Sequence, residues 1–126
     1  MSNIPELNKN VMDTILALKE MPEVQKGLQL CLDQEPYAMQ EQITICEIPA
    51  PTFKEEVRGK YLASLMEKYG LEDVHLDEIG NCGGLLKGTN NGPVLAMGAH
   101  MDTVFPEGTP IKVTQEGNVY HAPGLG

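Results

Sequence analysis

The segment 94–103 constrains the fold of this chain more than any other part of the sequence. It opens with an uninterrupted apolar run at 94–99 and then turns polar, with His100 and Asp102 at its end. A β-strand that is buried on both faces has such a near-continuous apolar sequence, so we predict a buried strand at 94–99. Ligands of open α/β sheets collect beyond the carboxyl ends of strands, which makes His100 and Asp102 the first candidates for a functional site.

The spacing of His100 and Asp102 indicates how the two side chains could cooperate. Side chains alternate along an extended chain, so both residues point the same way if the strand persists. The carboxylate can then accept one imidazole N–H while the other ring nitrogen binds a metal ion. Two alternatives stay open: Asp102 could simply cap a turn, and the pair could belong to a hydrolytic triad. No Gly-x-Ser-x-Gly nucleophile motif accompanies it, however.

Apolar residues at helical spacing dominate the first half of the chain. They predict one amphipathic helix at 6–20 and a second pattern from 24 to 46, in which we expect a break or kink at Pro36. Thr52 to Glu55 has the sequence of a capping box, in which Thr52 caps the following helix. Gly70 is the expected C-cap residue of that helix.

The period of the apolar residues shortens towards two in the second half. This predicts a hairpin over 74–86 with its turn at 80–81, and a second hairpin over 111–121. Asn90-Asn91-Gly92 is a strong turn signal before the strand at 94–99. We therefore expect one unit of the α/β class, with helices followed by a small mixed sheet.

Composition excludes several classes of protein. The net charge of −9, from 18 acidic and 9 basic residues, argues against binding to a nucleic-acid backbone. The longest apolar run is far shorter than the roughly 20 residues of a membrane helix, and the N-terminus lacks the pattern of a signal peptide. We therefore expect a cytoplasmic protein with no membrane partner. Cys31, Cys46 and Cys82 suit neither a disulfide framework nor a zinc motif, so buried reduced thiols are expected, Cys31 and Cys46 on apolar helical faces.

Four segments, in order and spacing, resemble the M20 family of co-catalytic zinc exopeptidases and deacylases. They are Ala99-His100-Met101-Asp102-Thr103-Val104, Ile48-Pro49-Ala50-Pro51-Thr52, Asp77-Glu78-Ile79-Gly80-Asn81 and Ala122-Pro123-Gly124-Leu125-Gly126. The resemblance extends from about Gln42 to Gly126, with Ala122 in place of the more usual glycine. Residues 1–41 look like a less distinctive helical leader.

The resemblance implies a three-layer α/β/α zinc-exopeptidase-like domain that hydrolyses amide bonds of small peptides. N-acyl amino-acid deacylation is the alternative within the family. Two zinc ions, with cobalt or manganese as alternatives, would polarise the substrate carbonyl and activate a bridging water. His100 would be one metal ligand and Asp102 the catalytic-site residue that orients it. Gly124 and Gly126 would allow close backbone approach around the metals, whereas His75 is interpreted as a surface residue and His121 as structural or close to the site.

The family's remaining metal ligands, its glutamate general base and its lid or dimerisation domain have no counterpart in residues 1–126. We therefore expect an N-terminal fragment of a catalytic domain, with 1–41 as leader and 42–126 as the family-like part. One histidine is too few for a catalytic zinc, so weak or no metal binding and no activity are expected of the isolated chain. A hypothesis of a different class is a non-catalytic interaction module that self-associates through an exposed sheet edge.

Overall fold

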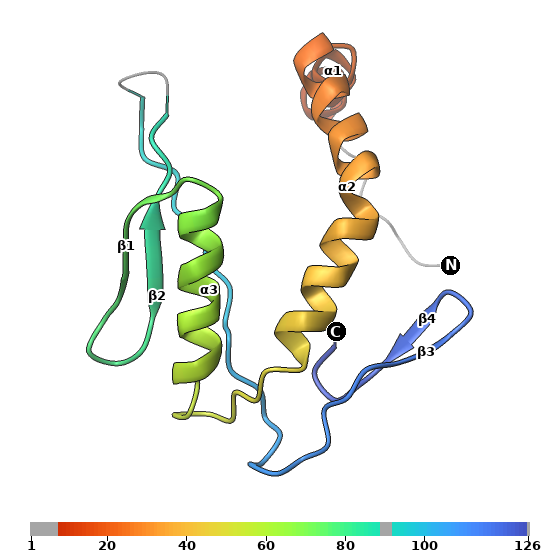
Figure 1. Cartoon of the computed structure of the whole chain (residues 1–126). Helices are drawn as coiled ribbons and strands as arrows, with labels where there is room; N and C mark the ends of the chain where they lie inside the picture. The colour runs from red at the N-terminus through yellow and green to blue at the C-terminus, as the bar shows by residue number, and fades with distance from the viewer. Residues whose placement is uncertain (1–7, 89–91, 126) are drawn as a thin grey trace. The chain divides into compact units, whose positions relative to one another are not determined.

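A computed structural model describes residues 8–88 and 92–125 of the chain (Figure 1). The chain divides into two compact units, Met1–Gln40 and Glu41–Gly126, each of which is described by itself. The elements are α1 (Lys9–Lys19), α2 (Pro22–Cys46), α3 (Glu56–Lys68), β1 (Glu72–Leu76), β2 (Cys82–Leu85), β3 (Thr114–Glu116) and β4 (Val119–His121). Two predictions, the turn centred on Asn90-Asn91 and the role of Gly126, lie outside the described residues.

Helices α1 and α2 begin at residues that satisfy or avoid the unpaired N–H groups of a helix start. The side chain of Asn8 accepts the Asn10 N–H at 2.9 Å, and Pro22 takes the first position of α2, where a missing N–H costs nothing. Of the break or kink expected at Pro36, a break is wrong, because α2 is continuous over 25 residues with Pro36 inside it. Proline removes one helical hydrogen bond and its ring crowds the preceding turn, but the helical bonds on either side keep the segment helical. In the part of the chain described here, no helix is long and apolar enough to cross a membrane.

The three cysteines are free thiols in different surroundings. Cys46 is buried and Cys82 is half-buried, but Cys31 is exposed, so the expectation of a buried thiol is wrong for Cys31. An apolar helical face becomes buried only where another element covers it. At Cys46 the sulfur lies 3.8 Å from the carbonyl oxygen of Pro123, whereas none of the described side chains at positions 8–40 is buried.

Helix α3 packs against the β1–β2 hairpin within the second unit (Figure 1). Gly59 allows the close approach, since a Cβ at this position would lie 2.9 Å from Cδ2 of Leu76. The helix ends one residue before the predicted position, with Tyr69 as its C-cap and Gly70 directly after it. Gly70 has a φ of +80°, and the N–H of Leu71 reaches back to the carbonyl of Met66 at 3.0 Å, which satisfies an unpaired carbonyl of the last turn.

Both predicted hairpins are present, but they do not share a sheet. β1 and β2 pair antiparallel, and so do β3 and β4, in two separate two-stranded sheets. The carboxylate of Asp77 closes the first turn by accepting the N–H groups of Ile79 and Asn81 at 3.0 and 2.8 Å. Gly117, with a φ of +61°, forms the second turn. The combination of helices and small sheets is consistent with the α/β class, whereas the single mixed sheet that we expected is not formed among the described residues.

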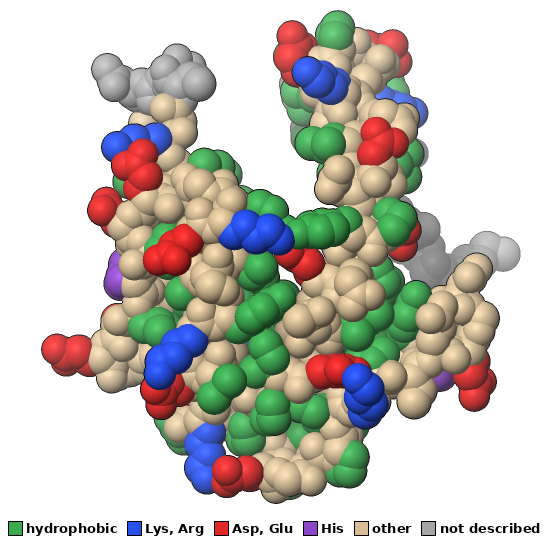
Figure 2. Space-filling view, viewed as in Figure 1, with side chains coloured by type: hydrophobic (Ala, Val, Ile, Leu, Met, Phe, Trp, Pro, Cys, Tyr) green, Lys and Arg blue, Asp and Glu red, His purple; other side chains and the backbone are tan. Residues whose placement is uncertain are grey.

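The buried strand predicted at 94–99 is also absent. Residues 92–100 form neither helix nor strand, and the side chains of Val94 and Met97 are each 89% exposed. A strand needs a neighbour for its N–H and C=O groups. No described segment pairs with 94–99. The first backbone pairing after this run is at Thr103, which forms an isolated parallel bridge with Pro51. Figure 2 shows many apolar side chains open on the face in view.

Candidate functional site

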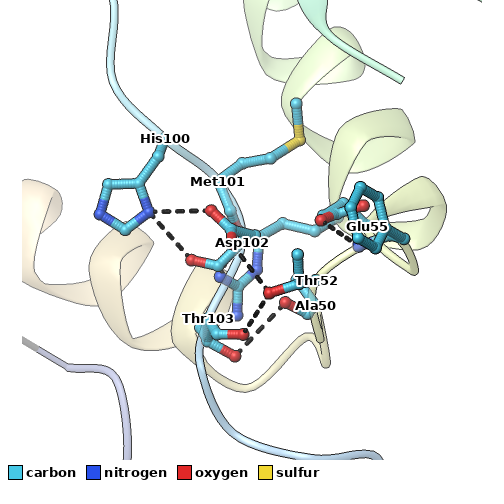
Figure 3. Close-up of polar contacts among 9 residues, drawn as sticks. Ala50, Thr52, Glu55, His100, Met101, Asp102 and Thr103 are labelled. Atoms are coloured by element: carbon cyan, nitrogen blue, oxygen red, sulfur yellow. Dashed lines mark hydrogen bonds and ion pairs between the residues drawn. The ribbon is translucent and has the colours of Figure 1, made fainter. Parts of the chain in front are cut away.

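His100 and Asp102 contact each other as the spacing predicted (Figure 3). Nδ1 of His100 lies 3.2 Å from Oδ1 of Asp102 and 3.0 Å from the backbone oxygen of the same residue. Both partners are hydrogen-bond acceptors, so Nδ1 of the neutral ring must carry the proton and donate. The lone pair is then on Nε2, the atom through which this imidazole could bind a metal. The His100 side chain is 84% exposed, which leaves that nitrogen accessible.

Thr52 holds the other oxygen of the Asp102 carboxylate. Its hydroxyl donates to Oδ2 of Asp102 at 3.1 Å. The prediction that Thr52 caps α3 is therefore wrong: the helix begins at Glu56, Glu55 takes the cap position, and its side chain makes no cap hydrogen bond. The reason lies in the backbone between them. Phe53 has a φ of +67° and its N–H donates to the Glu55 carboxylate at 2.7 Å, so the chain turns before the helix starts and carries Thr52 away from it.

The backbone of the His-x-Asp segment is anchored to the loop that precedes α3. The N–H of Thr103 donates to the carbonyl of Ala50 at 2.8 Å, next to the parallel bridge between Pro51 and Thr103. Ala50 is buried. Two segments about fifty positions apart in the sequence are thus joined at the site (Figure 3).

Arg58 on α3 is a buried part of this site that we did not predict. It is only 6% exposed, and its guanidinium donates to the carbonyls of Met101 at 2.7 Å, of Ile48 at 2.6 and 3.0 Å, and of Cys46 at 3.4 Å. Burial lowers the pKa of Arg58, and the nearby Cys46 and Asp102 act in the opposite direction. An arginine stays charged even so. The one available signal was that Arg58 is the sole arginine of the sequence.

The glycine-rich segment at 122–125 lies against Thr103 through Gly124, whereas the expected approach of this segment to metal ions stays a prediction. Gly124 has a φ of +79°, and a Cβ there would come within 3.2 Å of Cγ2 of Thr103. The amide of Gln42 donates to the carbonyl of Leu125 at 2.9 Å and ties this segment to the end of α2. The glycine therefore allows packing against the residue that follows Asp102.

The other two histidines lie away from these contacts. His75 is exposed on β1, where its Nδ1 is 2.7 Å from the carbonyl oxygen of Asp73, and His121 is exposed on β4. In the described part of the chain, no group of three or more His, Cys, Asp and Glu side chains is arranged to hold a metal ion. Catalytic zinc normally takes three protein ligands and a water. The pair of His100 and Asp102 thus fits one corner of a zinc site, and these residues alone do not complete it.

Comparison with known proteins finds similarity to hydrolases. The chain is 39% identical over 69 residues to a Pyrococcus furiosus protein that carries the provisional name LysW-lysine/LysW-ornithine hydrolase, over 55% of this chain and 20% of the relative. A Pyrococcus abyssi protein with the same provisional name is 35% identical over 75 residues, over 60% of this chain and 20% of the relative. The matches thus span a fifth of the length of these relatives. No protein-family profile matches the chain.

Proposed function

We propose that the unit at 41–126 contributes a histidine ligand to the zinc site of an M20-type hydrolase that cleaves amide bonds. The observation that carries this proposal is the geometry of His100. Two acceptors of Asp102 face its Nδ1, which leaves Nε2 exposed and in the form that binds a metal. The similarity to hydrolases over more than half of the chain supports the same reaction class.

In this proposal each residue has a distinct task. His100 supplies one nitrogen to the metal, and Asp102 fixes the tautomer and the orientation of the ring. Bound zinc would polarise the substrate carbonyl and acidify a water. The three-layer α/β/α arrangement, a second metal ion and the remaining ligands belong to the proposal as well, and those ligands would come from outside the described residues.

The proposed substrate is an amino acid joined through an amide bond to a second group. The names of the two relatives describe hydrolysis of LysW-lysine and LysW-ornithine. A small peptide is our first choice for this chain because of its resemblance to the peptidase branches of the M20 family. An N-acyl amino acid is the alternative, since the same amide chemistry applies to both.

Zinc titration of the 126-residue chain, followed by NMR of the three histidine side chains, tests the ligand assignment. We expect weak binding in which Nε2 of His100 responds first, an effect that His100→Ala abolishes. His75→Ala is the matched control, because it removes an exposed imidazole from β1 and should leave the response intact. Zinc that perturbs only His75 or His121 would contradict the proposal.

A specific observation favours a second function, self-association of the chain. The segment 94–97 is exposed and outside any helix or strand, and the described residues give it no strand partner. Unpaired edges with apolar side chains are templates for pairing with another chain. Light scattering should then show a concentration-dependent dimer that Met97→Glu disrupts. Leu32→Glu, at an exposed apolar position of α2, is the control that should keep the dimer, and a monomer at every concentration would refute this function.

A further inference from the structure

We propose that Thr52 and Arg58 are positioning residues that fix the orientation of His100 and Asp102. This inference rests on the proposed function for its catalytic meaning, but the contacts that support it are independent of any metal. Neither residue touches the exposed Nε2 of His100. Each acts through Asp102 or its neighbouring backbone.

Thr52 acts on the carboxylate itself. One oxygen of Asp102 accepts from the His100 ring at 3.2 Å, and the other accepts from the Thr52 hydroxyl at 3.1 Å. A carboxylate held at both oxygens cannot rotate about its terminal torsion without losing one of the two bonds. Thr52 therefore keeps Oδ1 directed at the imidazole. Together with the backbone oxygen of Asp102, which lies 3.0 Å from the same ring nitrogen, Oδ1 favours the tautomer with the proton on Nδ1.

Arg58 acts on the backbone between the two site residues. Met101 separates His100 from Asp102, and its carbonyl accepts from Nη1 of Arg58 at 2.7 Å. This bond fixes the peptide plane that joins Met101 to Asp102. The same guanidinium also holds the carbonyl of Ile48 at 2.6 Å, at the start of the loop that carries Thr52.

The fork of Arg58 thus links both sides of the site. One side is the loop 48–52, and the other is the segment with His100 and Asp102. These two segments are also joined directly, because the Thr103 N–H donates to the carbonyl of Ala50 at 2.8 Å. A lysine could keep the charge, but it lacks the planar fork that reaches two carbonyls in fixed directions. The shape of the guanidinium, as well as its charge, is therefore part of the inference.

The test separates positioning from a merely structural contribution. In the ¹⁵N-labelled 126-residue chain, at a pH where histidine is neutral, the nitrogen shifts report the His100 tautomer and hydrogen exchange reports the Thr103 amide. We expect wild type to hold the proton on Nδ1. Thr52→Val should give a mixed tautomer and at least about fivefold faster exchange at Thr103, the factor for loss of about one hydrogen bond, whereas Thr52→Ser should restore both values.

Thr109→Val is the matched control. It removes a hydroxyl from the same unit that donates to the carbonyl of Pro106 at 2.6 Å, so both readouts should match wild type. Arg58→Lys should also give a mixed tautomer. Since Arg58 is the sole arginine of the sequence, its Nε–H resonance can be assigned without ambiguity and should show protection in wild type.

Three outcomes would overturn the inference: an Nε2–H tautomer in wild type, an unchanged tautomer in Thr52→Val, or an equal response in Thr109→Val. The tautomer of wild type can be measured even if the substituted chains do not fold, so the first outcome tests the inference in every case. Failure of the proposed function looks different, because zinc would then perturb His75 or His121 and not Nε2 of His100, while the effects of Thr52→Val on tautomer and exchange remained.

Discussion

The hydroxyl of Thr52 donates to the carboxylate of Asp102 at 3.1 Å across fifty positions of sequence. Asp102 in turn accepts from His100, so a short chain of hydrogen bonds runs from the loop before α3 to an exposed imidazole. Residues of this kind are easily misread from sequence. Thr52 fits the pattern of a helix cap, yet its hydroxyl is used at the candidate site.

Replacing Arg58 by methionine should strongly destabilise the second unit. The substitution leaves the carbonyls of Ile48 and Met101 without their donors in a largely buried place. We expect a loss of about 2–4 kcal/mol in the free energy of unfolding, measured by urea denaturation. Lys60→Met is the control: it removes a cation from an exposed pair with Glu56 on the same helix and should leave the urea midpoint nearly unchanged. Equal midpoints for both variants would contradict the role of Arg58.

Alanine at Gly124 should destabilise the chain, whereas alanine at Gly27 should stabilise it. Gly124 combines a φ of +79° with a Cβ position 3.2 Å from Thr103, so the expected cost is about 1–2 kcal/mol. Gly27 lies inside α2 with nothing within 4 Å of its Cβ position, and alanine there should add about 0.5–1 kcal/mol. Thermal unfolding of the two variants measures both effects. Shifts of the same sign would show that the conformation of Gly124 does not matter.

Acid should weaken the β1–β2 turn through Asp77. Hydrogen bonds from the side chain and backbone of Asn81, and from the backbone of Ile79, lower the pKa of this carboxyl. The folded pKa is thus below the unfolded value of about 3.9. The contribution of Asp77 is fully present above that value and is lost as the pH falls through the folded pKa. Stability of wild type and Asp77→Asn, followed by circular dichroism from pH 6 to pH 2, should converge at the acid end.

Glu78→Gln provides the comparison for that experiment. It neutralises the neighbouring exposed carboxylate in the same turn, so it should retain the acid sensitivity of wild type. A pH profile for Asp77→Asn as steep as that of wild type would assign the acid sensitivity to other groups.

The 126-residue chain should not hydrolyse dipeptides or N-acyl amino acids, even with added zinc. His100 is the one imidazole at the candidate site, and the described residues form no group of three or more metal-binding side chains, whereas a catalytic zinc takes three protein ligands. Release of amino acids, measured by chromatography, should equal that of buffer and of His100→Ala. Zinc-dependent turnover that disappears in His100→Ala would refute this expectation.

Much of the local structure could be predicted because it depends on residues close in sequence. The end of α3 at Gly70 is an example, since glycine adopts the positive φ that this helix end requires. The hairpins around Asp77 and Gly117 likewise follow from turn residues and alternating apolar positions. The contact of His100 with Asp102 spans two residues and was predicted for the same reason.

Most of the failures are features that depend on distant parts of the chain, although the uninterrupted helix at Pro36 is a local one. The apolar run at 94–99 has the composition of a buried strand, but composition cannot supply the neighbouring strand that would bury it. Thr52 changed from an expected cap to a partner of Asp102, because Phe53 turns the backbone before α3 begins. Cys31 has an apolar helical neighbourhood like that of Cys46, but only Cys46 is covered.

The sequence by itself determined roughly where the helices and turns lie and that His100 pairs with Asp102, since these depend on backbone preferences and spacing over a few residues. Only the tertiary structure decided that Arg58 and Thr52 hold this pair, and that 94–99 stays unpaired among the described residues. The physical reason is that hydrogen-bond donors and acceptors are satisfied by whichever groups the folded backbone brings within reach. For Arg58 those groups are the carbonyls of Ile48, which precedes it in the sequence, and of Met101, which follows it.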